Sequence, residues 1–319
     1  MKRFALALLA TLAFAAWAQP FPSRPVKIVV PTTPGGATDA LSRSIGARLS
    51  EVWGQPVVVE NKPGATQIIG GDYVAKAPPD GYTLIVSDAA TFIMNPILHK
   101  NLPYDGLRAF TPITLLVRFP WVIAVNASLP VSDFHELVAY ALAHPGAISY
   151  GSFGTGSSGH ISVEYLKNRL GIDIVHVPYK GAGPAVTDLL SGQIQMMMVT
   201  PLLVEPHARA GKLRLIAAAT PKRISRLPDL PTVAESGVPN YEAGTWFALA
   251  GPAGMPRDVT YAIYNEVKKV LNEPAFKERY IDKQWFEVVA NTPDEFAEFL
   301  KSDYERWEKL IRLSHVKVE

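Results

Sequence analysis

Apolar residues in this chain form short runs that alternate with stretches in which apolar residues recur at helical spacing. The short runs predict strands at 26–30, 57–60, 82–86, 121–125, 148–150, 174–177, 194–199 and 213–218. Helical spacing predicts helices at 40–52, 70–77, 132–143, 185–190 and 258–271, and one after Gly159. Strands that alternate with helices are typical of parallel sheets covered by helices. The sequence therefore predicts an α/β fold, and the restart of the pattern near 121 indicates a second domain.

A last helix is predicted where Thr292 precedes Pro293 and where Glu295 follows three residues after the threonine. This spacing forms a capping box, and proline suits the first helical position. Phe296 and Trp307 belong to the apolar stripe that follows. We therefore expect a capped helix to begin at 293.

The first residues have the three regions of a secretory signal peptide. Lys2 and Arg3 precede an apolar run at 4–14, and Ala16-Trp17-Ala18 supplies the small residues of a cleavage site. The run is shorter than the roughly 20 residues that a membrane span needs. Residues 1–18 are therefore predicted to be an export signal that is removed.

Charge and composition exclude several classes of function. The chain has 31 basic and 29 acidic residues, and removal of Lys2 and Arg3 leaves 29 of each. A mature chain without basic excess has no electrostatic footprint for nucleic acid or an anionic membrane. The absence of cysteine excludes disulfides, thiolate metal sites and cysteine nucleophiles. About 300 mature residues exceed the usual size of one domain, which again favours two.

Two glycine-rich turns carry the candidate chemistry. The segments 34–39 (PGGATD) and 154–159 (GTGSSG) each close an expected strand and open an expected helix. Glycine lets the backbone approach a ligand closely, and the first N–H groups of a helix lack internal partners at its positive end. The pattern predicts two anion-binding helix N-termini, with a small carboxylate as the natural ligand.

Two enzymatic interpretations of the second turn fit less well. Its G-x-G-x-x-G spacing resembles a dinucleotide fingerprint, but Asp173 comes before the next strand, too early for the acidic residue that holds the ribose. Ser157 and Ser158 lie near His160, which suggests a serine hydrolase, but the G-x-S-x-G elbow is absent. The histidines show no H-x-x-x-H or H-E-x-x-H spacing, so we expect neither metal nor cofactor.

Two other residues are candidates for the walls of a binding pocket. Lys180 follows an expected strand in the loop PYKGAG, where it either reaches an anion or lies in solvent. Trp246 follows Gly244 and forms either an aromatic wall or part of the core. Both alternatives stay open on the sequence alone.

Five motifs in order give the chain a family resemblance: VVPTTPGGATD at 29–39, ENKPGA at 60–65, PDGYTL at 79–84, VPYKG at 177–181 and LPTVAE at 230–235. Their order resembles that of the periplasmic substrate-binding proteins of tripartite tricarboxylate transporters, the Bug family. The resemblance implies a two-lobed Venus-flytrap fold of type II-like topology, joined by two crossing strands. We expect one lobe at 19–121 with 242–319 and the other at 122–241.

The resemblance also implies a ligand site in the cleft between the lobes. With the candidates above, the expected ligand-binding residues are Thr32, Gly35, Gly36, Asp39, Ala89, Thr155, Ser157, Ser158, Lys180, Thr200 and Trp246. Asp39 matches an acidic position of the family, but its place in a helix turn also suits a structural role. Where many members have an aspartate near the end of the strand after Gly192, this chain has Gln195 and then Thr200. An aspartate at that place would pair with a ligand amine. We therefore expect an aliphatic or aromatic mono- or dicarboxylate without an ammonium group.

The sequence thus predicts a monomeric periplasmic receptor, not an enzyme, that passes a carboxylate to membrane permease subunits. Two other functions remain as alternatives. One is a secreted hydrolase that uses Ser157 or Ser158, and the other is a carboxylate receptor that signals to a sensor protein.

Overall fold

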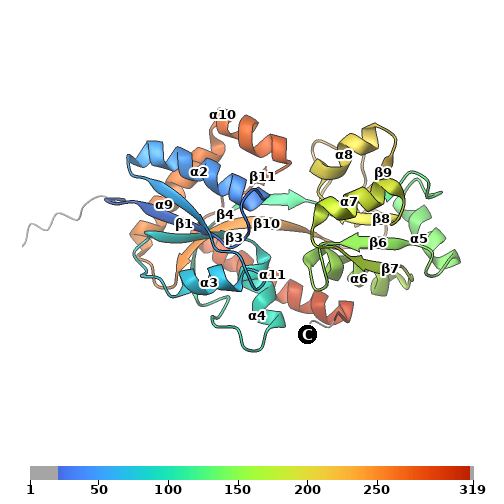
Figure 1. Ribbon diagram of the computed structural model, residues 1–319, viewed down its shortest axis with the longest axis horizontal. Coiled ribbons are helices and arrows are strands. Elements are labelled where there is room, and N and C mark those ends of the chain that lie inside the picture. Colours follow the sequence, from blue (N-terminus) through green and yellow to red (C-terminus); the bar gives the residue numbers. More distant parts are fainter. Residues whose placement is uncertain (1–20, 317–319) are drawn as a thin grey trace, which may run out of the picture.

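Two separate β-sheets organise the chain in the computed structural model, which describes residues 21–316 (Figure 1). The first sheet has the order β11-β4-β10-β3-β1-β2 and the second β7-β6-β8-β5-β9. The first contains β1 (Val26–Val30), β2 (Val57–Asn61), β3 (Thr83–Ser87), β4 (Phe110–Pro120), β10 (Gly244–Pro252) and β11 (Glu287–Val288). The second contains β5 (Val122–Asn126), β6 (Ser149–Ser152), β7 (Val175–Pro178), β8 (Met196–Val199) and β9 (Leu213–Ala218). The signal peptide predicted at 1–18 lies outside the described residues.

Helices cover both sheets (Figure 1). The helices that pack on the first sheet are α2 (Ala37–Trp53), α3 (Ile68–Ala75), the π-helix η1 (Ala90–Met94), α4 (Asn95–Leu98), α9 (Arg257–Asn272), α10 (Pro274–Phe276) and α11 (Pro293–Ser314). The helices that pack on the second sheet are α5 (Phe134–Ala143), α6 (Ser158–Leu170), α7 (Ala182–Ser191) and α8 (Pro201–Arg209). Neighbouring strand residues belong to opposite cores: Ile28 and Leu84 lie on one face of the first sheet, and Val29 and Ile85 on the other. Continuous apolar runs in these strands follow from burial on both faces.

The sheets are mixed, whereas the sequence pattern predicted parallel ones. β10 runs antiparallel to both β3 and β4, and β5 runs antiparallel to β8 and β9. The reason is the double crossing: β4 leads out of the first sheet into β5, and β10 brings the chain back, so the two strands run in opposite directions. At the start of β10, a Cβ on Gly244 would lie 2.8 Å from the carbonyl oxygen of Phe119, and only glycine allows this approach.

The last helix, α11, contacts both halves of the molecule. Its predicted capping box is confirmed: Thr292 Oγ1 accepts from the Glu295 amide, and Glu295 Oε2 accepts from the Thr292 amide. α11 packs against β4 and also against α6, where Asn168 Nδ2 donates to the carbonyl oxygen of Leu313 at 3.0 Å. Among the helices of residues 21–316, none combines the length and hydropathy of a membrane span.

Candidate functional site

A cavity of about 560 Å³ lies between the two sheets. Its walls come from the segments after β2 and β3, from η1 and α4, from the loop that joins β6 to α6, and from the crossing strand β10. The lining residues are Thr66, Gln67, Asp88, Ala89, Ala90, Met94, Asn95, Leu98, His99, Phe153, Thr155, Gly156, Ser157, Ser158 and Thr245. Four predicted site residues, Ala89, Thr155, Ser157 and Ser158, thus meet in one cavity.

The N-terminus of α6 forms one wall of this cavity. Ser157 is the N-cap residue, with extended backbone, and its Oγ accepts from the His160 amide at 3.3 Å. Ser158 opens the helix beside it. The Ser157 hydroxyl and the free amides of the first helical turn are hydrogen-bond donors. A group of donors at a helix N-terminus favours an anion. This wall therefore suits a carboxylate.

Two stacked histidines support the loop beneath that wall. The Gly156 amide donates to His160 Nδ1 at 3.0 Å, so this nitrogen carries no proton. The rings of His160 and His176 stack with centroids 3.8 Å apart and planes at 9°. Burial lowers the pKa of His160, and burial with the neighbouring His160 lowers the pKa of His176 to about 4. Because Nδ1 of His160 is engaged by a backbone amide, it is not placed to take a proton from Ser157 or Ser158.

The opposite wall has a strained backbone. Ala65, Thr66 and Gln67 have φ values of 46°, 51° and 76°, which are unfavourable for residues with a side chain. Asn95 Nδ2 holds the Thr66 carbonyl at 2.9 Å. Gln67 Oε1 accepts from Ser87 Oγ at 2.7 Å and from Thr91 Oγ1 at 2.8 Å. Such strain persists only where the surroundings fix it, and it is common at ligand sites.

Asp88 and Gln67 belong to this wall, and the sequence analysis missed both. Asp88 Oδ1 accepts from the Ala90 amide at 2.8 Å, and Gln67 Nε2 donates to Oδ1 and Oδ2 at 3.1 and 3.2 Å. Burial raises the pKa of Asp88, and these hydrogen bonds only partly oppose the effect. The available signal was the position of Asp88 directly after a buried strand, because ligands of α/β sheets bind at the carboxyl ends of strands.

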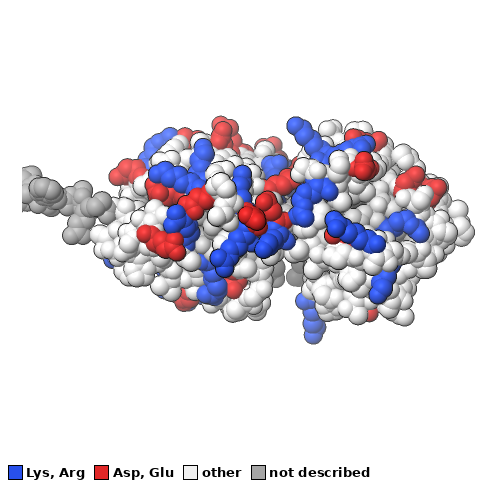
Figure 2. Space-filling model, turned by 90° about the horizontal axis from the view of Figure 1, so that it is seen from above, with Lys and Arg blue, Asp and Glu red and all other residues white. Residues whose placement is uncertain are grey.

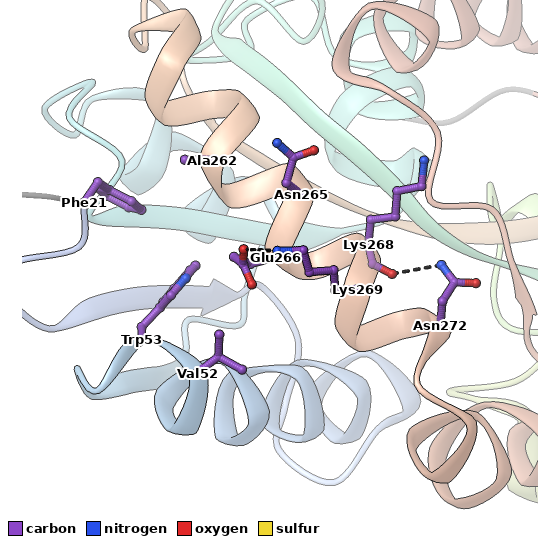
Figure 3. A pocket seen from close by; sticks show the side chains of 9 residues that line it. All are labelled: Phe21, Val52, Trp53, Ala262, Asn265, Glu266, Lys268, Lys269 and Asn272. Carbon is purple, nitrogen blue, oxygen red and sulfur yellow. Dashed lines mark hydrogen bonds and ion pairs between the residues drawn. The ribbon is translucent and has the colours of Figure 1, made fainter.

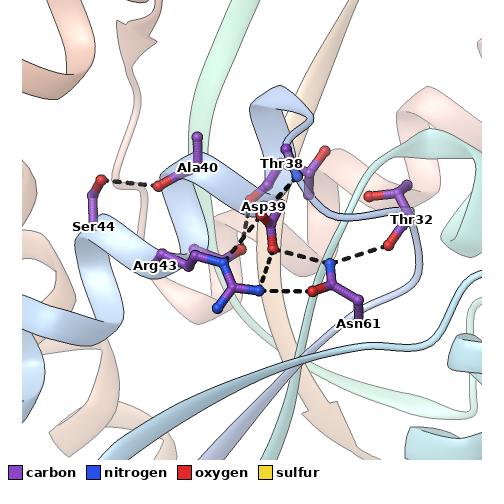
Figure 4. Close-up of polar contacts among 9 residues, drawn as sticks. Thr32, Thr38, Asp39, Ala40, Arg43, Ser44 and Asn61 are labelled. Carbon is purple, nitrogen blue, oxygen red and sulfur yellow. Dashed lines mark hydrogen bonds and ion pairs between the residues drawn. The ribbon is translucent and has the colours of Figure 1, made fainter.

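The first glycine loop lies outside this cavity, and Asp39 holds it in place (Figure 4). Asp39 is 4% exposed; its Oδ2 accepts from the Gly35 amide, while Arg43 and Asn61 contact its carboxylate at 2.9–3.1 Å. Burial raises the pKa of Asp39, but the hydrogen bonds from Arg43, Gly35 and Asn61 outweigh it, so the pKa is lowered overall. Asn61 also donates to the Thr32 carbonyl at 3.1 Å. Asp39 thus positions the loop that contains Thr32, Gly35 and Gly36.

We expect Asp39→Ala to lower the free energy of unfolding by about 2 kcal/mol, because it leaves the Gly35 amide and Asn61 without their acceptor. Urea unfolding monitored by circular dichroism measures the change. Asp229→Ala is the matched control, because Asp229 is an exposed aspartate in a turn and exposed charges contribute at most about 1 kcal/mol. Equal losses in the two variants would contradict the positioning role of Asp39.

Three further candidates also lie outside the cavity. Lys180 is exposed between β7 and α7. Thr200 is the N-cap of α8, and its hydroxyl accepts from the Leu202 amide at 3.4 Å. Trp246 is 4% exposed, stacks on Phe92 and belongs to a core cluster. Its indole donates to Asp303 Oδ2 at 3.0 Å, so the structure places Trp246 in the core and not in the wall of this cavity.

A second cavity, of about 830 Å³, lies on the outside of the first sheet's helices (Figure 3). It is an open groove between the end of α2 and α9, with Phe21, Val52 and Trp53 on one side and Lys268 and Lys269 on the other. None of the predicted site residues lines it. The cavity between the sheets is smaller but gathers four of them, so we take it as the candidate site.

On the face that Figure 2 shows, the first-sheet half carries no field of one sign that would select a macromolecular polyanion. Figure 2 shows Lys and Arg interspersed with Asp and Glu over the first-sheet half, and a constriction between the two halves. On this half, selection of an anion therefore depends on the donors inside the cavity.

The fold and site describe a two-lobed α/β binding protein, and comparison with known proteins agrees. Residues 41–315 match the model of the tripartite tricarboxylate transporter family receptor, so the chain belongs to that family. Protein BugT of Bordetella pertussis is 33% identical over 95% of this chain and 93% of its own length. The fold class and the family resemblance predicted from sequence are thereby confirmed.

Two solved structures are similar over nearly their whole length. A protein of R. palustris solved with adipate is 35% identical, with a TM-score of 0.81, and the match covers 93% of this chain and 99% of that one. MatC from Rhodopseudomonas palustris, solved with bound malate, is 31% identical with a TM-score of 0.76, covering 91% of this chain and 100% of that one. Both ligands are carboxylates.

Proposed function

We propose that this chain is a receptor that binds a small carboxylate between its two lobes and delivers it to the membrane subunits of a transporter. The observation that carries the proposal is the cavity itself, which places the N-terminus of α6 opposite the segments after β2 and β3. Membership of the receptor family and the adipate- and malate-bound structures of relatives support it.

In this proposal, residues 19–121 with 242–319 form one rigid lobe and residues 122–241 form the other. A ligand that contacts both lobes favours the closed state, because only that state offers both sets of partners. Ala89, Thr155, Ser157 and Ser158 contact the ligand within the cavity. Thr32, Gly35, Gly36, Lys180 and Thr200 stand at the ends of the facing strands and are proposed to approach the ligand on closure.

The receptor is proposed to act in the periplasm as a monomer, after export by the signal at 1–18. Both walls of the cavity come from one chain, so the site is complete without a second copy. The receptor is proposed to break no bond, because His160 Nδ1 is engaged by the Gly156 amide and is not placed to act as a base for Ser157 or Ser158. A receptor that signals to a sensor protein would use the same cavity, and membrane-subunit genes beside this one would favour transport.

A thermal-shift panel of carboxylic acids, each paired with its primary amide, tests the proposal. A ligand specific to the folded state raises the melting temperature, and adipate and malate belong in the panel. The acids are expected to stabilise and the amides are not, because an amide brings N–H donors to the donor-rich end of α6. Stabilisation by no acid, or equally by acid and amide, would overturn the proposed carboxylate site.

We expect Ser157→Ala combined with Ser158→Ala to weaken binding of the best panel acid at least roughly tenfold. Hydrogen bonds to a charged group contribute about 1.5–3 kcal/mol each, whereas loss of the Ser157 cap costs the fold only about 1 kcal/mol. Calorimetry measures the affinity, and urea unfolding the stability. Thr187→Ala with Ser191→Ala removes two exposed hydroxyls of α7 and is the control. Unchanged affinity in the Ser157 and Ser158 variant would make these serines purely structural.

A further inference from the structure

Asp88 gives the cavity an acidic end that the carboxylate-binding role of α6 does not explain. It follows β3 directly, lines the cavity, and takes part in no ion pair among the residues that the structure describes. No lysine or arginine stands among the lining residues of this described cavity, and His99 is the one other titratable side chain there. A ligand group near Asp88 therefore meets a carboxylate with no basic side chain to balance it.

The hydrogen bonds around Asp88 fix its orientation and leave acceptor capacity. Ser87 and Thr91 donate to Gln67 Oε1, which directs Gln67 Nε2 at the carboxylate. Oδ1 accepts from both Gln67 and the Ala90 amide, whereas among the residues that the structure describes Gln67 is the one hydrogen-bond donor to Oδ2. Each carboxylate oxygen accepts about two hydrogen bonds. Oδ2 therefore keeps a free acceptor position, which a donor on the ligand would fill.

The two walls thus differ in chemistry. The α6 wall presents the Ser157 and Ser158 hydroxyls and backbone amides, which suit a carboxylate, whereas the Asp88 wall presents an acceptor. Burial already disfavours the charged form of Asp88, as its raised pKa shows, and a second negative group beside it would add like-charge repulsion. A ligand with a carboxylate at one end and a cationic donor at the other complements both walls: its carboxylate meets the donors of α6, and its cationic donor meets Asp88.

We propose, resting on the proposed receptor function, that Asp88 selects a carboxylate whose far end carries a hydrogen-bond donor, above all an ammonium group, over a dicarboxylate. This reverses the expectation drawn from Gln195 and Thr200, because the acidic partner is supplied by the first lobe instead of the second. Asp88 is thus a specificity-determining residue, and the ligand class is an ω-amino carboxylate.

Matched pairs of ligands with the same number of carbon atoms test the inference by calorimetry at pH 7. The pairs are succinate with γ-aminobutyrate, glutarate with δ-aminovalerate, and adipate with ε-aminocaproate; the corresponding ω-hydroxy acids separate a neutral donor from a charged one. In at least one series the amino acid is expected to bind at least tenfold more tightly than the diacid, with the hydroxy acid between them. This comparison uses the unmodified protein and needs no variant to fold.

The variant Asp88→Asn then tests whether Asp88 causes the preference for the amino acid over the diacid. Asparagine keeps an oxygen at the Oδ1 position for the Ala90 amide and for Gln67, and loses only the longer contact of Gln67 with Oδ2 at 3.2 Å, so the wall should retain its shape. The variant is expected to lose at least tenfold in affinity for the amino acid while the diacid binds equally or more tightly. Asp173→Asn removes the same charge from an exposed site outside the cavity and should change neither affinity.

The outcomes separate the inference from the proposed function. A diacid that binds as tightly as its amino acid, or equal losses of both ligands in Asp88→Asn, would overturn the role of Asp88 and leave the receptor function standing. The same holds if other acids of the thermal-shift panel bind but no ω-amino or ω-hydroxy acid does. Failure of every carboxylic acid would overturn the proposed function itself, and the inference with it.

Discussion

Trp246→Ala is expected to lower the free energy of unfolding by about 3–5 kcal/mol, the usual cost of truncating a buried tryptophan. The side chain is 4% exposed, its ring stacks on Phe92 with centroids 6.0 Å apart, and Phe296 packs against its edge. Truncation also leaves Asp303 Oδ2 without the indole N–H, although Arg306 still pairs with this carboxylate. Urea unfolding gives the change in stability.

Trp246→Phe separates a core role from a ligand-contacting one. Phenylalanine keeps an aromatic ring against Phe92 and loses only the indole group, so we expect a smaller loss of stability, about 1–2 kcal/mol. Affinity for the best acid of the thermal-shift panel should be unchanged. A tenfold loss of affinity in a stable Trp246→Phe protein would restore Trp246 to the wall of the binding site.

The second large effect is a loss of stability as pH falls from about 6.5 to about 4. The pKa of His176 is lowered to about 4 from an ordinary value of 6.5, and that of His160 is also lowered. Between these values the unfolded chain binds more protons than the folded one, so stability is present above pH 6.5 and is lost toward pH 4. Solvent around these partly buried rings reduces the effect, which we expect to be at most about 3 kcal/mol.

The loop over the stacked rings should respond to the same protonation. A doubly protonated His160 cannot accept from the Gly156 amide, so ligand binding should weaken in the same pH range. Glu164 favours protonation of both rings and Lys167 opposes it, and the two side chains pair with each other at 3.1 Å. The charges facing the rings therefore largely cancel, and burial sets the direction.

Urea unfolding at several pH values between 4 and 7 measures the effect. His176→Gln keeps a polar partner for Ser152 but removes the titrating ring, and should flatten the pH dependence. His135→Gln alters an exposed histidine of α5 and is the matched control. The same slope in wild type, His176→Gln and His135→Gln would show that carboxylates, and not the stacked rings, cause the pH dependence.

The local pattern of apolar residues predicted the strands that are buried on both faces. The apolar runs that became β1, β3 and β8 begin or end within two residues of their predicted bounds, and the capping signal of α11 was confirmed. β4 (Phe110–Pro120) was missed over most of its length, because Thr111, Pro112 and Thr114 interrupt its apolar pattern. Its antiparallel pairing with β10 joins residues far apart in sequence and leaves no local signal.

The sequence predicted those residues of the candidate site that one loop supplies. It did not predict the residues that line the site only because the two lobes meet. The turn with Thr155, Ser157 and Ser158 carries its own glycine and capping signals. The first glycine loop carries the glycine signal as well, yet it lies outside the cavity, because the relative placement of the lobes decides which loops face each other. Gln67 depends on three successive left-handed residues and on partners at Ser87 and Asp88, none of which marks it locally.

The contact between α11 and α6 restricts how the lobes can move. α6 presents the proposed ligand wall at its N-terminus, and near its other end Asn168 hydrogen-bonds to Leu313 of α11. Figure 1 shows α11 reaching α6. A rigid rotation that preserves this contact has its axis close to α11, and displacement grows with distance from an axis. The Ser157 wall would then travel a short arc, while α8 and the Thr200 end of β8 would sweep a longer one. The second lobe would then hold the carboxylate close to the rotation axis, while α8 would move over the entrance of the cavity.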